Sequence, residues 1–253
     1  MNLFGKTDVA IDIGPETSHV CVRGRGIVFS GRTEEMRAAS GAKELSALMS
    51  ECLARAGIRR GMFRPAIRAV LTVDHGIGDA EKREFEDAAT QAGAKAVFLL
   101  ELPMASAIGA GLPISEARGS MIVEMRGGEC QVAVISLAGI VVARDICECI
   151  ATSAANGSEL RCVRGDPIPR EMIAGAMKEV LAECAAKGHK NLVSDVLDCG
   201  AVITGGEGVD EDLVKWLAEK VGFPVRVAAN PATAAVEGTG VVLNELDFLS
   251  PRL

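Results

Sequence analysis

The sequence predicts an α/β protein made of two similar halves, and three observations lead to this prediction. Residues 8–30 and 119–144 share one pattern: an apolar strand ending in an acid, a glycine-containing turn and an alternating strand. After each hairpin, strand and helix signals alternate, which is typical of sheets covered by helices. The 253 residues, 49% of them hydrophobic and 24% charged, suffice for two modest globular domains. We therefore expect domains at 1–113 and 114–253.

The internal repeat aligns Asp12 with Glu124, a shift of about 112 positions, and places Val20 and Val22 on Val132 and Val134. Such a duplication puts two acid-tipped glycine turns at matching places in two domains. If the domains face each other, the turns meet in a cleft, where turns of this kind commonly bind phosphate. The simpler alternative, that both are ordinary tight hairpins, stays open.

The remaining elements follow from apolar spacing and from proline and glycine at segment ends. One helix is expected at 44–56, where five apolar side chains repeat at helical spacing: Leu45, Leu48, Met49, Cys52 and Leu53. The other expected helices are 79–92, 103–111, 169–187, 210–221 and 231–243, and the other strands are 66–73, 96–100, 200–204 and 224–227. Residues 31–40 and 151–165 are expected to be connectors.

Composition excludes several classes of protein. The net charge of −7 and the lack of a basic stripe argue against nucleic-acid binding, which needs a cationic face. No window reaches the roughly 18 apolar residues of a membrane span, and the first residues lack a signal-peptide core, so we expect a cytoplasmic protein.

The eight cysteines form no CxxC pair and are expected to be reduced and mostly buried. Cys147 and Cys149 would share a strand face, but without nearby ligands a structural role is favoured over a metal site.

Several segments together carry a family resemblance. They are AIDIG (10–14), QAGAKAVFLLELPMASAIGAGLP (91–113), GSMIVEMRGGECQVAVISLAGIV (119–141) and AVITGGEGV (201–209), closing with GFPVRVAANPATAAVEGTG. In order and spacing they resemble the actin superfamily and, within it, the bacterial MreB-like proteins. The resemblance implies two ribonuclease-H-like domains of the actin/Hsp70 superfold. Because connectors 31–40 and 151–165 are too short for a subdomain with its own core, both outer subdomains are expected to be missing.

The resemblance also implies a nucleotide site for ATP or ADP with Mg²⁺. Asp12 and Gly14 would belong to the first phosphate turn, and Glu124 with the Gly127–Gly128 pair to the second. The adenosine would lie against Gly205 and Gly206. In such a site backbone amides face phosphate, while acids such as Asp12 and Glu124 position the metal through water.

Four departures from the family pattern predict that this site is degenerate, with binding weak or absent. Pro15 removes an amide donor and Glu16 places a carboxylate where phosphate charge would lie. Arg126 replaces a glycine in the second turn. Leu102 stands where the family has the acid that orients the hydrolytic water, and leucine cannot do this. We therefore expect little or no ATP hydrolysis and no catalytic residues.

Two further contacts are considered, one from the internal repeat and one from the family resemblance. Glu16 and Arg126 would project from opposing turns and could form an ion pair that joins the domains without nucleotide; the alternative is that both point into water. Met62 and Phe63, flanked by arginines, lie where MreB-like proteins carry a membrane-inserting loop and could anchor to an anionic leaflet. The alternative is that they tuck under a sheet edge.

The function expected from these residues is an MreB-like cytoskeletal or scaffold protein in bacterial cell shape or spatial organisation. Its partners would be other actin-like subunits or morphogenesis proteins, and its location the cytoplasm, at the inner face of the cell membrane if the anchor is real. The alternative is an ATP-binding, chaperone-like or ATPase protein of the same superfold, similar to the ethanolamine-utilisation EutJ type, because the superfold hosts many functions.

Overall fold

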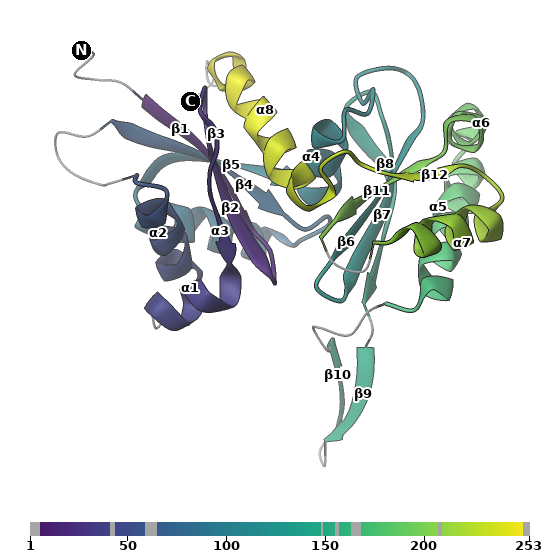
Figure 1. The fold of residues 1–253 in the computed structure, drawn as a ribbon, viewed down its shortest axis with the longest axis horizontal. Coiled ribbons are helices and arrows are strands. Elements are labelled where there is room, and N and C mark those ends of the chain that lie inside the picture. Colours follow the sequence, from purple (N-terminus) through teal and green to yellow (C-terminus); the bar gives the residue numbers. More distant parts are fainter. Residues whose placement is uncertain are drawn as a thin grey trace. The chain divides into compact units, whose positions relative to one another are not determined.

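The computed structural model describes residues 6–40, 44–58, 65–147, 149–154, 157–162, 168–206 and 209–249 (Figure 1). The described residues form an α/β fold with two five-stranded sheets and one separate pair of strands. The chain divides into two compact units: unit 1 comprises Met1–Gly109 and Thr233–Leu253, and unit 2 comprises Ala110–Ala232. The α/β class and the two covered sheets confirm the fold predicted from the sequence.

The sheet of unit 1 has the strand order β3-β2-β1-β4-β5. Its strands are β1 (Lys6–Ile13), β2 (Thr17–Val22), β3 (Gly26–Arg32), β4 (Ala66–Val73) and β5 (Ala94–Glu101). The central strand β1 pairs antiparallel with β2 and parallel with β4. Because successive side chains alternate across a sheet, Val9 and Ile11 enter one apolar cluster and Ala10 enters another on the opposite face.

Helices cover both faces of this sheet. They are α1 (Thr33–Ser40), α2 (Leu45–Arg55), α3 (Asp79–Gln91), α4 (Leu102–Gly109) and α8 (Ala234–Leu249), which follows a short 3-10 turn, Pro231–Thr233. The predicted stripe of α2 is confirmed, since its apolar side chains Leu48, Met49, Cys52 and Leu53 are all buried. Met49 and Leu53 share a cluster with the α3 residues Ala88 and Ala89. Helix α8 packs on the other face, against Ala10, Cys21 and Val70.

Helices α4 and α8 pack together so closely that glycine is needed at their contact. A Cβ atom on Gly109 would lie 1.8 Å from the Ala234 carbonyl oxygen, and one on Gly238 would lie 1.9 Å from the Ala105 carbonyl oxygen. No side chain fits at these distances, so both positions depend on glycine. This contact places α8 in unit 1. The sequence analysis had instead assigned all residues after 113 to the second domain.

A group of charges, buried at Asp8 and Arg68 and exposed at Asp247, also fixes α8 to the sheet. Arg68 on β4 donates to Asp8 on β1 through Nε and Nη2, both at 2.6 Å, and through Nη2 to Asp247 of α8 at 2.8 Å. Arg23 donates to Asp8 at 3.1 Å and to Asp247 at 2.7 Å. Burial would raise the pKa of Asp8, but the hydrogen bonds from Arg68 and Arg23 hold it below its usual range. The strands β1 and β4, the turn after β2 and helix α8 thus share one ionic network.

The sheet of unit 2 has the order β12-β11-β6-β7-β8. Its strands are β6 (Ser120–Arg126), β7 (Glu129–Ser136), β8 (Gly139–Cys147), β11 (Ala201–Gly205) and β12 (Val225–Val227). Strand β6 is antiparallel to β7 and parallel to β11, which repeats the arrangement around β1. Its helices are α5 (Arg170–Ala186), α6 (Lys190–Cys199) and α7 (Glu211–Val221), and residues such as Met177 and Leu217 pack with Val123 and Val132 in one core.

Four elements differ from the prediction. Helix α1 lies in the expected connector 31–40, where Thr33 bonds to the first hairpin. The connector 151–165 contains most of an antiparallel pair, β9 (Cys149–Ala154) and β10 (Gly157–Cys162). Helix α6 was not predicted, although its apolar side chains Leu192, Val193 and Val196 recur at helical spacing. The stretches where the resemblance places subdomain inserts therefore hold α1 and the β9–β10 pair.

Candidate functional site

The second predicted phosphate turn is a two-residue hairpin loop. Arg126 of β6 and Glu129 of β7 face each other in the strand register, and Gly127 and Gly128 connect them. Both glycines have positive φ, 54° and 80°, which matches the primed turns that follow the right-handed twist of the strands. Glycine adopts this conformation without steric cost, so the local sequence explains the turn.

Glu124 lies on β6, two residues before the end of the strand, and both of its carboxylate oxygens have a partner. The Thr204 hydroxyl of β11 donates to Oε2, and Arg126 Nη2 lies 3.3 Å from Oε1. The side chain of Glu124 is 2% exposed and that of Arg126 is 18% exposed. Arg126 therefore has the more exposed side chain of this pair. Sequence reasoning missed Thr204, whose only signal was its position one residue before the glycine turn.

The predicted adenosine turn lies at the same end of the same sheet. Thr204 and Gly205 of β11 pair in register with Glu124 and Met125 of β6. Gly205 has φ +109°, and a Cβ atom there would lie 1.7 Å from the Met125 carbonyl oxygen. This approach requires glycine. The structure thus brings Glu124, Gly127, Gly128, Gly205 and Gly206 to one edge of unit 2.

The first predicted turn belongs to unit 1 and is closed by internal hydrogen bonds. The amide of Gly14 donates to the Thr17 carbonyl oxygen at 2.9 Å, and Pro15 has no amide to offer. The Thr33 hydroxyl and amide donate to the carbonyl oxygens of Gly14 and Glu16 at 2.7 Å and 2.8 Å. The first two residues of this turn therefore direct no amide at a ligand. Thr33 is a further residue that the sequence did not indicate.

The acid that precedes the first turn, Asp12, is buried, with 2% of its surface exposed. It lies opposite His19 in the strand register. Asp12 and Glu124 occupy equivalent places in the two sheets, each on a central strand that pairs antiparallel with the next strand and parallel with a later one. This correspondence agrees with the repeat read from the sequence.

Leu102 begins α4 and is buried, with 3% exposure. The preceding Glu101 lies within 3.2 Å of His75 Nδ1, and these side chains are 41% and 29% exposed. Position 102 therefore carries an apolar side chain without any acceptor for a water proton. His75, on the loop after β4, was not among the predicted site residues.

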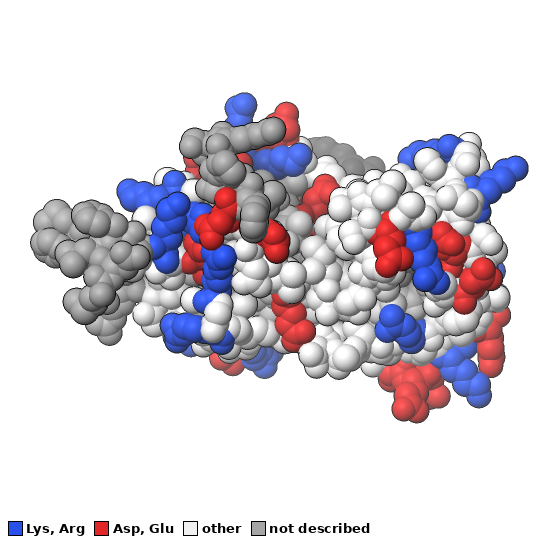
Figure 2. All heavy atoms as spheres, turned by 90° about the horizontal axis from the view of Figure 1, so that it is seen from above, with Lys and Arg blue, Asp and Glu red and all other residues white. Residues whose placement is uncertain are grey.

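The predicted membrane residues, Met62 and Phe63, lie outside the described residues. Within the part of the chain that the structure describes, no helix combines the length and apolarity that crossing a membrane requires. Acidic and basic side chains lie side by side on the face drawn in Figure 2, and no continuous basic stripe is visible there.

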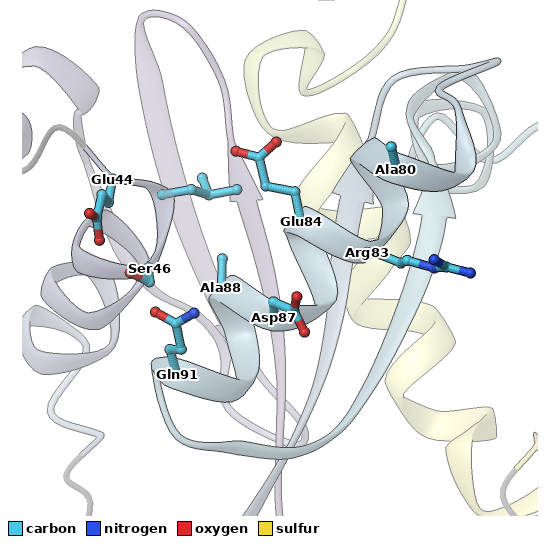
Figure 3. Close-up of a pocket in the computed structure, with 9 residues that line it drawn as sticks. Glu44, Ser46, Ala80, Arg83, Glu84, Asp87, Ala88 and Gln91 are labelled. Carbon is cyan, nitrogen blue, oxygen red and sulfur yellow. The ribbon is translucent and has the colours of Figure 1, made fainter.

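Two hollows in unit 1 lie apart from the predicted turns. One, of 480 Å³, lies between the start of α2 and α3; Figure 3 shows Glu84, Asp87 and Gln91 of α3 along it, with Glu44 opposite and Arg83 directed away. The other, of 460 Å³, lies between the β2–β3 turn and α8 and is lined in part by Cys21 and Val241. Neither contains a residue predicted to hold nucleotide.

The two sheets and their acid-tipped hairpins define the class of this protein, which has an actin-like fold. The chain aligns with the crystal structure of MreB 5 of Spiroplasma citri bound to AMPPNP with a TM-score of 0.69 and 15% identity, over 96% of this chain and 98% of that one. It also aligns with a subunit of the MamK double helical filament, with a TM-score of 0.61 and 13% identity, over 95% and 99% of the two chains.

Sequence comparison identifies the family. The family model described as MreB/Mbl protein matches residues 39–164 and 166–251. The cell shape-determining protein MreB of Escherichia coli (strain K12) is 34% identical over 239 residues, covering 74% of this chain and 68% of its own length. The chain belongs to the MreB/Mbl family.

Proposed function

We propose that this chain is an MreB-like cytoskeletal or scaffold protein in bacterial cell shape or spatial organisation, with a degenerate ATP site that binds nucleotide weakly and hydrolyses little or none. Membership of the MreB/Mbl family supports the cytoskeletal part, since the E. coli relative is a cell shape-determining protein. The AMPPNP-bound Spiroplasma structure supports a retained nucleotide.

One observation carries the proposal of low hydrolysis: Leu102 is buried at the start of α4, where the family resemblance expects the acid that orients water. General-base assistance typically contributes a rate factor of about 10² to 10⁴, and an alkyl side chain supplies none of it. The first turn supports the same proposal, because Gly14 gives its amide to Thr17 and Pro15 has none. A nucleotide bound at these turns would lose donors that phosphate normally uses.

The proposed partners are like subunits or morphogenesis proteins, as the filament-forming MamK neighbour suggests for the fold. We also propose peripheral membrane contact through Met62 and Phe63. The Glu16–Arg126 pair stays a proposal; Arg126 already pairs with Glu124 inside its own hairpin, so Glu16 would have to share this guanidinium.

A phosphate-release assay with Mg-ATP, run beside a pelleting assay, tests the function. We expect assembly or co-sedimentation without phosphate release above background. The Thr204→Val variant is the control for a contaminating ATPase, because it removes the hydroxyl that holds Glu124. Steady release in the native chain that disappears in this variant would refute the low-hydrolysis proposal.

The membrane proposal has its own measurement. Sedimentation with anionic vesicles should show binding that falls at least several-fold when Met62 and Phe63 are both changed to Ser. Neutral vesicles serve as the control for charge. Equal binding by the native chain and the double variant would contradict the proposed membrane contact.

A further inference from the structure

We propose that Cys149 and Cys162 form a reversible disulfide that fastens the β9–β10 pair of strands when the protein is oxidised. The two residues are register partners in this antiparallel pair. The sequence alone offered only Cys147 and Cys149 on one strand, with no further ligand nearby. The pairing of β9 with β10 brings a cysteine from the next strand to the same position of the ladder.

The strand register decides which kind of pair these cysteines form. Ala154 and Gly157 are the register partners nearest the turn, and only two residues separate them. In a two-residue hairpin this pair exchanges both backbone hydrogen bonds, and from there hydrogen-bonded and non-hydrogen-bonded pairs alternate. Cys149 and Cys162 are the fifth pair further along the ladder, so they form a non-hydrogen-bonded pair.

Non-hydrogen-bonded pairs are the places where antiparallel strands approach each other most closely. Their Cα atoms are about 4.5 Å apart, compared with about 5.5 Å at hydrogen-bonded pairs. A disulfide joins residues whose Cα atoms are roughly 4.4 to 6.8 Å apart. A disulfide between Cys149 and Cys162 therefore needs no change in strand register.

The other cysteines on strands have different register partners. Cys147 lies opposite Glu129 of β7, so it belongs to the five-stranded sheet of unit 2. Cys130 lies opposite Met125 of β6. Among the strand pairings that the structure describes, that of β9 with β10 is the one that places two cysteines opposite each other.

The β9–β10 pair has few other features that would stabilise it. It forms a two-stranded sheet of its own, separate from both five-stranded sheets. The sequences of its strands, CIATSA and GSELRC, contain only Ile150 and Leu160 as large apolar residues. Two strands alone are marginally stable in water, and small structures without a core commonly depend on a cross-link. A disulfide at the end away from the turn would therefore decide how persistently this pair of strands forms.

Glutathione disulfide is the oxidant in this proposal. The thiolate of one cysteine attacks a sulfur of glutathione disulfide, which forms a mixed disulfide and releases one molecule of glutathione. The thiolate of the other cysteine then attacks the protein sulfur of the mixed disulfide, which forms the protein disulfide and releases the second glutathione. The two protein thiols lose two electrons and two protons, and glutathione disulfide gains them. Excess glutathione reverses both exchanges, so the bond responds to the redox state of its surroundings.

Disulfide mapping of the full chain in glutathione redox buffers tests the proposal. Free thiols are alkylated, and the chain is then cut by trypsin after Arg161 and by Glu-C protease after Glu148, which places Cys147, Cys149 and Cys162 on three different peptides. We expect a cross-linked peptide that joins Cys149 to Cys162 within one chain. The effective concentration of the two thiols should be at least about tenfold higher in buffer than in concentrated urea, because only the folded chain has the strand register.

Cys147→Ser is the matched control, because it removes a neighbouring thiol and leaves the register pair in place. It should retain the cross-link in full, whereas Cys149→Ser and Cys162→Ser should each lose it. Glutathione attached to the exposed Cys199 shows that the buffer is oxidising. Trp216 fluorescence of each variant checks that unit 2 is folded.

Four results would each overturn the proposal. They are the absence of the Cys149–Cys162 peptide in a buffer that modifies Cys199, a bond to Cys147 in its place, a bond between two chains, and equal effective concentrations in buffer and in urea. None of these results depends on nucleotide binding or hydrolysis, so the proposed function is tested separately.

Discussion

Replacing Arg68 with Met should destabilise unit 1 by about 3 kcal/mol, the lower end of the cost of breaking a buried ion pair. Arg68 and Asp8 are each 5% exposed and share two hydrogen bonds of 2.6 Å. The variant leaves Asp8 buried with Arg23 alone, which is 3.1 Å away and 33% exposed. This remaining partner is why we expect the lower end of the range rather than its upper end.

Hydrogen exchange followed by mass spectrometry is the suitable assay, because it resolves β1 and α8 from the rest of the chain. A loss of about 3 kcal/mol corresponds to roughly a hundredfold faster exchange for amides that open with unit 1. Asp247 ties α8 to the same network, so the α8 amides should accelerate together with those of β1. Trp216 lies in unit 2, so the urea midpoint of unit 2, followed by Trp216 fluorescence, should change little.

Arg55→Met provides the control for this experiment. Arg55 pairs with Glu51 one helical turn away, at 2.7 Å, and the two side chains are 40% and 28% exposed. An exposed pair of this kind contributes about 0.3–0.5 kcal/mol. If Arg68→Met changed exchange no more than Arg55→Met does, the network would not hold α8 to the sheet and the reasoning would be wrong.

Three further predictions concern acid stability, a glycine and the thiols. Hydrogen bonds from two arginines outweigh burial and lower the pKa of Asp8. The stability that this carboxylate gives is therefore present above its unfolded pKa near 3.8 and is lost as the pH falls through the folded value. Between pH 5 and 3, the unfolding midpoint followed by circular dichroism should fall less in Asp8→Asn than in the native chain. Gly205→Ala should destabilise unit 2 by roughly 2 kcal/mol or more, because a Cβ atom would meet backbone at 1.7 Å, whereas Gly175→Ala in α5, with nothing within 4 Å, should be neutral or stabilising in urea unfolding. Among the thiols whose burial the structure describes, Cys199 is exposed and should react before Cys52 with a thiol reagent at pH 8, because burial raises the pKa of Cys52 to about 11. Equal labelling of the two by mass spectrometry would contradict this.

The sequence was sufficient to predict the elements that depend on local patterns. The repeat placed Val20 and Val132 at equivalent positions, and both are completely buried. The sequence predicted a glycine-containing hairpin turn in residues 119–144, and Gly127 and Gly128 form it as a two-residue loop with positive φ. Apolar spacing likewise placed the buried face of α2 correctly.

The contacts of the candidate site could not be predicted in this way, because they depend on strand pairing over long sequence separations. Thr204 reaches Glu124 across 80 positions, and only the parallel pairing of β6 with β11 brings them together. The pairing of Arg126 with Glu16 was one of two possibilities and stays a prediction; the contact of Arg126 with Glu124, two residues earlier on the same strand, was not predicted. Asp8 and Arg68 are 60 positions apart and show no shared pattern in the sequence.

The packing of α8 on unit 1 has a consequence for biosynthesis. Unit 2 is encoded inside unit 1, so the ribosome delivers all of Ala110–Ala232 before the helix that completes the first sheet. Until that helix emerges, the apolar face made by Ala10, Cys21 and Val70 has no cover from α8. At about 5–20 residues per second, this interval lasts roughly 6 to 25 seconds, and we expect the nascent chain to be most vulnerable to aggregation and most dependent on chaperones during it.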